Sequence, residues 1–212
     1  MNKLSNRFLV IMITLIGAIF MVIGATFAYF TSSASNNNGI IGNAYIFNTT
    51  MSITTKKSGS LIPLKSSLID RTMKSNNKCV DLNGNDICSY YQVTITNNGN
   101  IETLFGYIKT EDIANKYTTD HLHFKLYDTN YEPISGEGVL SPTVNSINYF
   151  KTTTNTNNLS LTLPIGSSVY YLAVWLNDPD DSNQLEDVNK KFVGSLVFEG
   201  SSGGKLSGEF ES

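Results

Sequence analysis

The chain has little charge. Only 16% of its 212 residues are Asp, Glu, Lys or Arg, and the formal net charge is −3. Without an excess of basic residues, a protein offers no electrostatic attraction for nucleic acid or for an anionic membrane surface. We therefore expect no nucleic-acid partner, and contact with a membrane only through the N-terminal segment described below.

The common catalytic motifs are also missing. No Gly-x-Ser-x-Gly elbow, His-Glu-x-x-His zinc motif, phosphate-binding loop or dinucleotide fingerprint occurs in the sequence. Paired carboxylates for glycoside chemistry stay open, because the distance between two carboxylates is a property of the fold. The sequence thus favours a non-catalytic protein without deciding the question.

The one long apolar run lies at the N-terminus. Lys3 and Arg7 precede the uncharged residues 8–30, and small residues stand at Thr26 and Ala28. This pattern predicts a secretory signal, residues 1–28, cleaved between Ala28 and Tyr29. The alternative is an uncleaved single-pass anchor, because about 20 apolar residues are enough to span a bilayer. Either way we expect the protein to be extracellular or at the cell surface.

The rest of the chain alternates strand-like and turn-like segments. Residues 29–43 read as a flexible leader, and residues 44–199 as one all-β domain, a β-sandwich or jelly roll. Short helices are conceivable only at 62–73 and 111–117. The Gly/Ser-rich residues 200–212 form a tail in which 205–210 is either a short edge strand or loose. The expected strands are 44–54, 90–96, 101–109, 122–127, 159–163, 169–176 and 191–199, of which 169–176 is the most apolar and should be central.

Residues 24–31 (GATFAYFT) carry a resemblance to a known family. They resemble the signals cleaved by the SipW-type signal peptidase of Gram-positive bacteria, whose substrates include TasA-like fibre proteins and camelysin. The later succession of CVDLNGNDIC, TNNG, YLAVWLN and FVGSL is similar to small secreted β-sandwich proteins of Firmicutes with such signals. The resemblance implies a SipW-type peptidase as partner and a place at the surface or in a biofilm matrix.

The same resemblance suggests a mode of self-assembly. In TasA-like fibres the N-terminal segment of one subunit completes the sheet of the next. Residues 29–47 contain the apolar Ile40, Ile41, Tyr45 and Phe47, which fit such a donated strand. The alternative is that residues 44–54 pair within their own sheet.

The two cysteines, Cys79 and Cys88, lie nine residues apart. In an exported protein such a pair predicts a local disulfide, which stabilises the fold by about 2–3 kcal/mol. Two reduced thiols are the alternative. Between them, Asp81, Asn83, Asn85 and Asp86 place oxygen ligands close together, as a calcium site requires. They do not follow the EF-hand pattern, and a tight turn demands the same residues.

Two further groups are candidate metal ligands. His121 and His123 on one strand would point to the same face and suit zinc, as the resemblance to camelysin, described as a metallopeptidase, implies. The sequence offers no third ligand, so two half-exposed strand residues are the alternative. The acidic residues 178–187 offer calcium ligands or form a solvated loop. Trp175, in the most apolar strand, is expected in the core.

These observations lead to one expectation with two alternatives. We expect an exported, non-catalytic structural protein of the cell surface or biofilm matrix, without a cofactor. The alternatives are a camelysin-like metallopeptidase and a calcium-dependent surface binding module.

Overall fold

The computed structural model describes residues 47–58, 61–113, 116–178, 187 and 190–211, which belong to one compact unit, 47–212. The signal segment, its cleavage site at Ala28 and Tyr29, and the leader lie outside the described residues. So do Ile40, Ile41 and Tyr45 of the predicted assembly strand.

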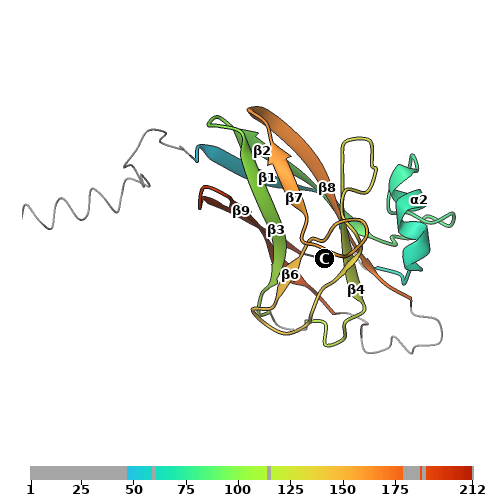
Figure 1. The fold of residues 1–212 in the computed structure, drawn as a ribbon. Coiled ribbons are helices and arrows are strands. Elements are labelled where there is room, and N and C mark those ends of the chain that lie inside the picture. Colours follow the sequence, from blue (N-terminus) through green and yellow to red (C-terminus); the bar gives the residue numbers. More distant parts are fainter. Residues whose placement is uncertain (1–46, 59–60, 114–115, 179–186, 188–189, 212) are drawn as a thin grey trace, which may run out of the picture. The chain divides into compact units, whose positions relative to one another are not determined.

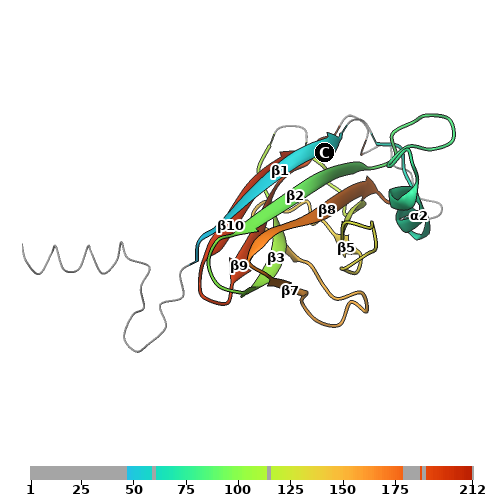
Figure 2. The same ribbon diagram turned by 90° about the horizontal axis from the view of Figure 1, so that it is seen from above.

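The described chain is a sandwich of two antiparallel sheets, which confirms the predicted fold class (Figures 1 and 2). The first sheet has the order β1 (Thr49–Lys57), β2 (Ser89–Asn97), β8 (Gly166–Leu176), β4 (Leu122–Tyr127) and β5 (Gly138–Val139). The second has the order β10 (Lys205–Glu211), β9 (Val193–Gly200), β3 (Glu102–Thr110) and β6 (Ile147–Tyr149), and β7 (Ser160–Leu163) also pairs with β3.

The alternating side chains of β2 show why these segments become strands. Tyr91, Val93 and Ile95 are fully buried between the sheets, whereas Gln92 and Thr94 on the other face are partly exposed. This period of two matches the pleat of a strand with one covered face. β8 is central, between β2 and β4, and its last five residues are buried on both faces. The predicted central strand is therefore confirmed.

A row of aromatic rings fills the space between the two sheets. Phe124 of β4 meets Phe150 edge to face, with ring centroids 5.1 Å apart. Phe150 in turn stacks on Phe198 of β9, with centroids 6.3 Å apart. All three rings are buried. Such aromatic contacts contribute beyond the apolar area that they cover.

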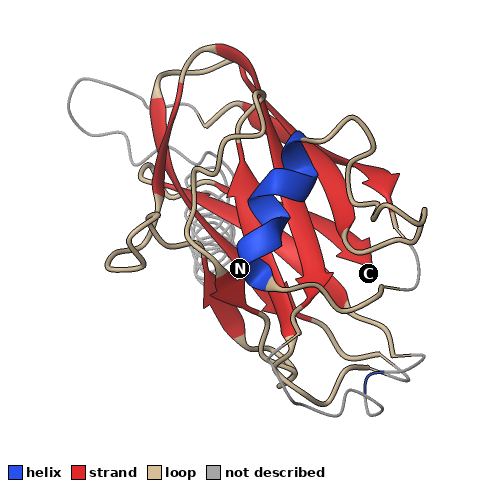
Figure 3. Cartoon of the chain, turned by 90° about the vertical axis from the view of Figure 1, so that its right-hand side faces the viewer, coloured by secondary structure: helices blue, strands red, loops and turns tan. Residues whose placement is uncertain are grey.

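The residues between β1 and β2 form a separate structure, which we call the insert (residues 61–88). It contains a short 3-10 helix, η1 (Ser66–Leu68), and the helix α2 (Ile69–Lys74), seen face-on in Figure 3. Ile69 and Met73 are fully buried against Ala173 and Trp175 on the outer face of the first sheet. The helix expected within 62–73 is thus present but shorter, and Trp175 is in a core, as predicted. The described residues of 111–117 are not helical.

The C-terminal Gly/Ser-rich segment belongs to the second sheet. Of the two alternatives for residues 205–210, the strand is present: β10 pairs along its whole length with β9. The sandwich therefore extends beyond residue 199, because Leu206 and Phe210 of β10 alternate inward and are buried.

β1 and β10 lie side by side and close one side of the sandwich (Figure 2). Gly208 of β10 makes this approach feasible: a Cβ there would lie 2.8 Å from the Cδ1 of Ile53 on β1. The ring of Phe210 meets Tyr91 at 5.0 Å, and the Tyr91 hydroxyl donates to the carbonyl of Glu211. Apolar side chains from both sheets thus seal this side.

Candidate functional site

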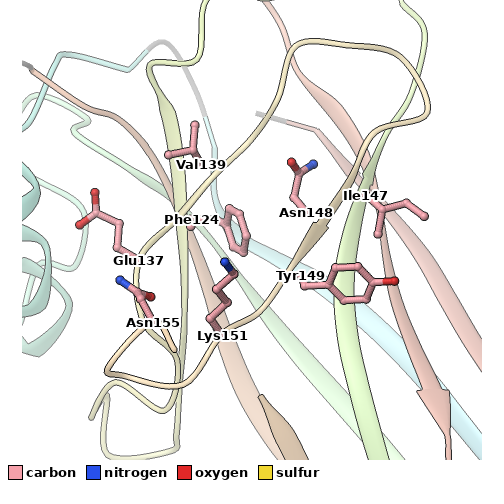
Figure 4. A pocket seen from close by; sticks show the side chains of 9 residues that line it. Phe124, Glu137, Val139, Ile147, Asn148, Tyr149, Lys151 and Asn155 are labelled. Atoms are coloured by element: carbon pink, nitrogen blue, oxygen red, sulfur yellow. The ribbon is translucent and has the colours of Figure 1, made fainter. Parts of the chain in front are cut away.

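The opposite side of the sandwich contains a cavity of about 500 Å³ between the edge strands β5 and β6. Figure 4 shows the ring of Phe124 in the middle of this pocket. Glu137, Val139 and Asn155 lie on the β5 side of the pocket. The other side is lined by three residues of β6, Ile147, Asn148 and Tyr149, and by Lys151, which lies two residues after β6. We call this pocket the edge groove.

The groove exists because its two bordering strands are very short. β5 has two residues and β6 has three, so neither sheet extends far along this side. Gly138 lies directly against Phe124, and a Cβ at that position would be 2.2 Å from the ring. The side chain of Asn148 holds β6 in place: its amide donates to the Ile108 carbonyl at 3.1 Å and its oxygen accepts the Ser141 N–H at 3.1 Å.

Apolar side chains at the groove remain exposed to solvent. The exposed fractions are 44% for Val139, 50% for Ile147 and 41% for Tyr149. Edge strands also present backbone N–H and C=O groups to which another strand can pair. Exposed apolar residues beside a hollow and a sheet edge are the features to which an added strand binds.

A polar network fixes the β5 wall of the groove to the rest of the first sheet. The Nδ1 of His123 hydrogen-bonds to Glu137, and Ser66 of η1 donates to the same Glu137 oxygen at 2.7 Å. The indole N–H of Trp175 donates to the Ser66 hydroxyl at 3.2 Å. Burial raises the pKa of the Glu137 carboxyl, but the hydrogen bonds from His123 and Ser66 outweigh it, so the pKa is lowered.

The order of this network differs from that of a hydrolytic triad. In a Ser-His-acid triad the imidazole contacts the serine hydroxyl and serves as its base. Here the single proton of the Ser66 hydroxyl has two acceptors within reach, Glu137 at 2.7 Å and the Asn177 side-chain oxygen at 2.8 Å. The imidazole of His123 instead binds the same carboxylate. The arrangement joins the insert to the groove wall.

The two predicted zinc ligands bind different carboxylates. His121 Nδ1 lies 2.8 Å from Asp187, whose side chain is buried and also accepts a hydrogen bond from Thr119. His123 pairs with Glu137, as described above. Within the described ranges, no group of three or more His, Cys, Asp or Glu is placed to hold a metal ion. The zinc alternative remains a prediction without a third ligand in this part of the chain.

The predicted calcium loop is built around Asp81. This carboxylate accepts the backbone N–H groups of Asn83 and Asn85, both at 2.8 Å, and the Asn85 amide at 2.9 Å. The side-chain hydrogen bond from Asn85, followed by its backbone N–H, lowers the pKa of Asp81. Asp86 pairs with Lys57 at 2.7 Å. These contacts are those of the tight turn, and calcium binding stays an untested prediction. Most of residues 178–187 lie outside the described residues.

The predicted disulfide is present. Cys79 and Cys88 are joined, with 4.8 Å between their Cα atoms, and both are fully buried within the insert. The bridge closes the Asp81 loop immediately before β2 begins.

Phe47 is the one residue of the predicted assembly strand that the structure describes. Its ring lies against Gly200 and Gly204 at the turn between β9 and β10, and it packs on the core of its own chain. The residues that follow it, from Thr49, pair with β2 in their own sheet. In the described part of 44–54, β1 thus pairs within its own sheet, and Phe47 packs on its own chain.

The groove residues were not among the predicted site residues. Glu137, Val139, Ile147 and Tyr149 lie in a stretch where strands of two or three residues produce no alternating pattern. The available signal was the run of turn-forming residues from Asp128 to Asn158, which indicates irregular chain between the sheets.

No protein-family model and no curated protein matches the chain. Among solved structures it is similar to AvmM, which catalyses macrocyclization in alchivemycin A biosynthesis, with 6% identity over 80% of this chain and 94% of that one, and a TM-score of 0.38. A lipoprotein from Bacteroides thetaiotaomicron has 15% identity over 83% and 85%, with a TM-score of 0.30. A collagen-binding domain from a Staphylococcus aureus adhesin has 10% identity over 59% and 86%, with a TM-score of 0.25. These similarities carry no inference about what this chain binds or catalyses.

Proposed function

We propose that this chain is an exported structural protein of the cell surface or biofilm matrix. In this proposal, the N-terminal segment of one copy fills the edge groove of the next. The observation that carries the proposal is the open side of the sandwich, where a cavity of about 500 Å³ lies between two short edge strands with exposed apolar side chains. The sequence supplies the complementary part, an apolar segment that precedes the body of the domain.

The placement of Phe47 sharpens which residues are donated. Because Phe47 and β1 belong to the donor's own sandwich, the donated strand is confined to residues 29–46. Ile40, Ile41 and Tyr45 lie, together with Ile46, in the part of that segment that precedes the sandwich in the sequence. Their side chains would enter the groove while their backbone pairs with the edge of β5 or β6.

This contact joins two different surfaces and therefore propagates. A heterologous contact between the N-terminal segment of one copy and the groove of another leaves a free segment and a free groove at the two ends. Unless the rotation between copies closes a ring, the product is a filament. The SipW-type signal, the TasA-like resemblance and a matrix role fit such a product and are part of the same proposal.

One further finding bears on export. The disulfide between Cys79 and Cys88 is typical of proteins in oxidising, extracytoplasmic compartments. Within the described part of the chain, no helix is long and apolar enough to cross a membrane. We place the protein outside the cell, with its N-terminal residues 1–28 removed by a SipW-type peptidase.

The test compares three forms of the protein by electron microscopy and sedimentation velocity: residues 29–212, the same chain without 29–38, and the compact unit 47–212. We expect filaments from the first, fewer from the second and monomers from the third. Filaments formed by 47–212 would overturn the proposal.

A matched pair of variants tests the groove itself. Ile147→Asp introduces a charge into the groove and should abolish filaments of 29–212. Ile165→Asp alters an aliphatic residue that is 67% exposed and does not line the groove, and it should leave assembly unchanged. Equal effects of the two substitutions would exclude the groove as the acceptor.

A further inference from the structure

The charge of this chain is unevenly distributed. Residues 56–88, the end of β1 and the insert, contain six Lys or Arg against three Asp. Residues 89–212 contain seven Lys or Arg against fifteen Asp or Glu. Two of the six cations, Lys56 and Lys57, lie at the end of β1, and the insert itself has four Lys or Arg against three Asp. The positive balance of residues 56–88 beside the acidic balance of residues 89–212 is not visible in the modest net charge of the whole chain.

The helix of the insert places one of these cations directly outward. Ile69 and Met73, one turn apart, are fully buried against the sheet. At 100° per residue, Arg71 points to the opposite side of α2, flanked by Leu68 and Lys74. Arg71 and Lys74 are exposed, and Leu68 is 43% exposed. This outer surface thus combines positive charge with an aliphatic side chain.

A fully exposed leucine stands at the tip of the loop that follows. Leu82 has the highest exposure of the large hydrophobic residues described, with its side chain entirely in solvent. Its loop is held rigidly, because the disulfide closes it and Asp81 accepts three hydrogen bonds within it. Gly84 completes the turn with a φ of +87°. Because the loop backbone is already restrained, burial of Leu82 by a partner costs little backbone conformational entropy.

A second aliphatic residue lies beside this loop. The backbone N–H of Ile62 donates to the carbonyl of Asp86 at 2.9 Å, and Ile62 is 43% exposed. In Figures 1 and 2, α2 and the green loop after it lie at the same end of the sandwich. Leu68, Ile62 and Leu82 are therefore exposed aliphatic residues of one small, basic structure.

We propose that the insert docks on an anionic lipid surface. Basic side chains attract the lipid headgroups, and exposed aliphatic residues enter the boundary between headgroups and acyl chains. Leu82 is the inserting residue, and Arg71 with its basic neighbours supplies the electrostatic attraction. This contact is separate from the edge groove and does not depend on filament formation.

The charge pattern also explains how a lipid surface orients the molecule. The acidic sandwich is repelled by an anionic bilayer, while the insert is attracted, so the protein should approach with the insert first. Ion pairs of Lys57 with Asp86 and of Lys74 with Glu132, both at 2.7 Å, neutralise part of the positive charge. The affinity should accordingly be modest and fall as salt is added.

The experiment is flotation of residues 29–212 with vesicles through a density gradient, because filaments alone do not float. Vesicles containing phosphatidylglycerol and phosphatidylcholine are compared with pure phosphatidylcholine, at low and at physiological ionic strength. We expect binding to the anionic vesicles only, weakened by salt. Equal binding to neutral vesicles, or no binding to anionic ones, would overturn the proposal.

Matched variants locate the contact on the insert. Leu82→Ser should reduce the bound fraction about tenfold, as expected for an aliphatic side chain that leaves water, and Arg71→Ser about fivefold. Ile165→Ser, an exposed aliphatic residue outside the insert, is the control and should bind as the parent does.

Two results would contradict this account of the insert. Undiminished flotation of Leu82→Ser would overturn the insertion of this side chain. If Leu82→Ser abolished concentration-dependent self-association of 47–212 while vesicle binding was absent throughout, the surface would be a contact with a second copy. Circular dichroism and thiol titration establish that each variant is folded with its disulfide closed.

Discussion

The two sides of this sandwich differ in how far side chains close the space between the sheets. On the side of β1 and β10, long strands bring Ile53, Gly208 and Phe210 together and exclude water. On the side of β5 and β6, strands of two and three residues leave a cavity and exposed apolar side chains. The same core therefore has one sealed side and one open side. This side is open because β5 and β6 are short, and not because apolar residues are lacking there.

The strongest test of this comparison is to remove one apolar side chain from each side. Phe210→Ala on the sealed side should lower the free energy of unfolding by about 3–5 kcal/mol, because it leaves a cavity against Tyr91. Ile147→Ala on the open side should change it by about 0.5 kcal/mol or less, because Ile147 is already half-exposed. Urea unfolding of residues 47–212 measures both. Similar losses would mean that the groove is closed in solution.

The disulfide gives the next largest effect. Replacing Cys79 and Cys88 by serine should lower the free energy of unfolding by about 2–3 kcal/mol, the value for a short loop. The loss should arise in the insert, which packs on β8 of the first sheet, whereas β9 and β10 belong to the second sheet. Hydrogen exchange should therefore show faster exchange around α2 and unchanged protection in β9 and β10. Uniform loss of protection would show that insert and sandwich unfold as one unit.

Phe47 separates stability from assembly. Phe47→Ala should destabilise the sealed side by about 1–2 kcal/mol, because a partly buried ring is lost from the β9–β10 turn. Filament formation by 29–212 should persist, since the donated segment ends before this residue. Thermal unfolding and electron microscopy on the same samples provide the two measurements, and Tyr149→Ala is the counterpart at the groove. For Tyr149→Ala we expect the reverse result, which is little change in the free energy of unfolding and weakened filament assembly.

The smallest expected effect is that of acid on the groove wall. The pKa of Glu137 is lowered in the folded protein, so its carboxylate stabilises the fold above the pKa of the unfolded chain. This contribution is lost as the pH falls through the folded pKa. Glu137→Gln should therefore be less stable than the parent at pH 7 and should lose less stability on acidification. Unfolding at several pH values between 7 and 3 checks this, with Glu209→Gln on β10 as control.

The fold was predictable where a strand was long enough to show its period. β2 was found because its residues alternate along the strand, and the apolar end of β8 because it is a continuous apolar run. β5 and β6 were missed because two or three residues contain no period. The groove between them was missed for the same reason, since it depends on where both sheets stop.

Contacts of the site residues were also predictable only where the partners are close in the sequence. The pairing of Cys79 with Cys88 followed from their spacing and an exported context. The partners of His121 and His123 did not, because Asp187 and Glu137 lie 66 and 14 residues away along the chain and only the fold brings them near. Net charge likewise describes the whole chain, whereas a membrane surface or a partner meets one face.

By itself, the sequence determined the all-β class, the central apolar strand and the local disulfide, because each depends on neighbours along the chain. The tertiary structure alone decided which side of the sandwich is sealed, which carboxylate each histidine meets, and how the basic insert stands on the acidic sheets. These features join residues that are distant in sequence, and their geometry depends on how far each strand runs before it ends.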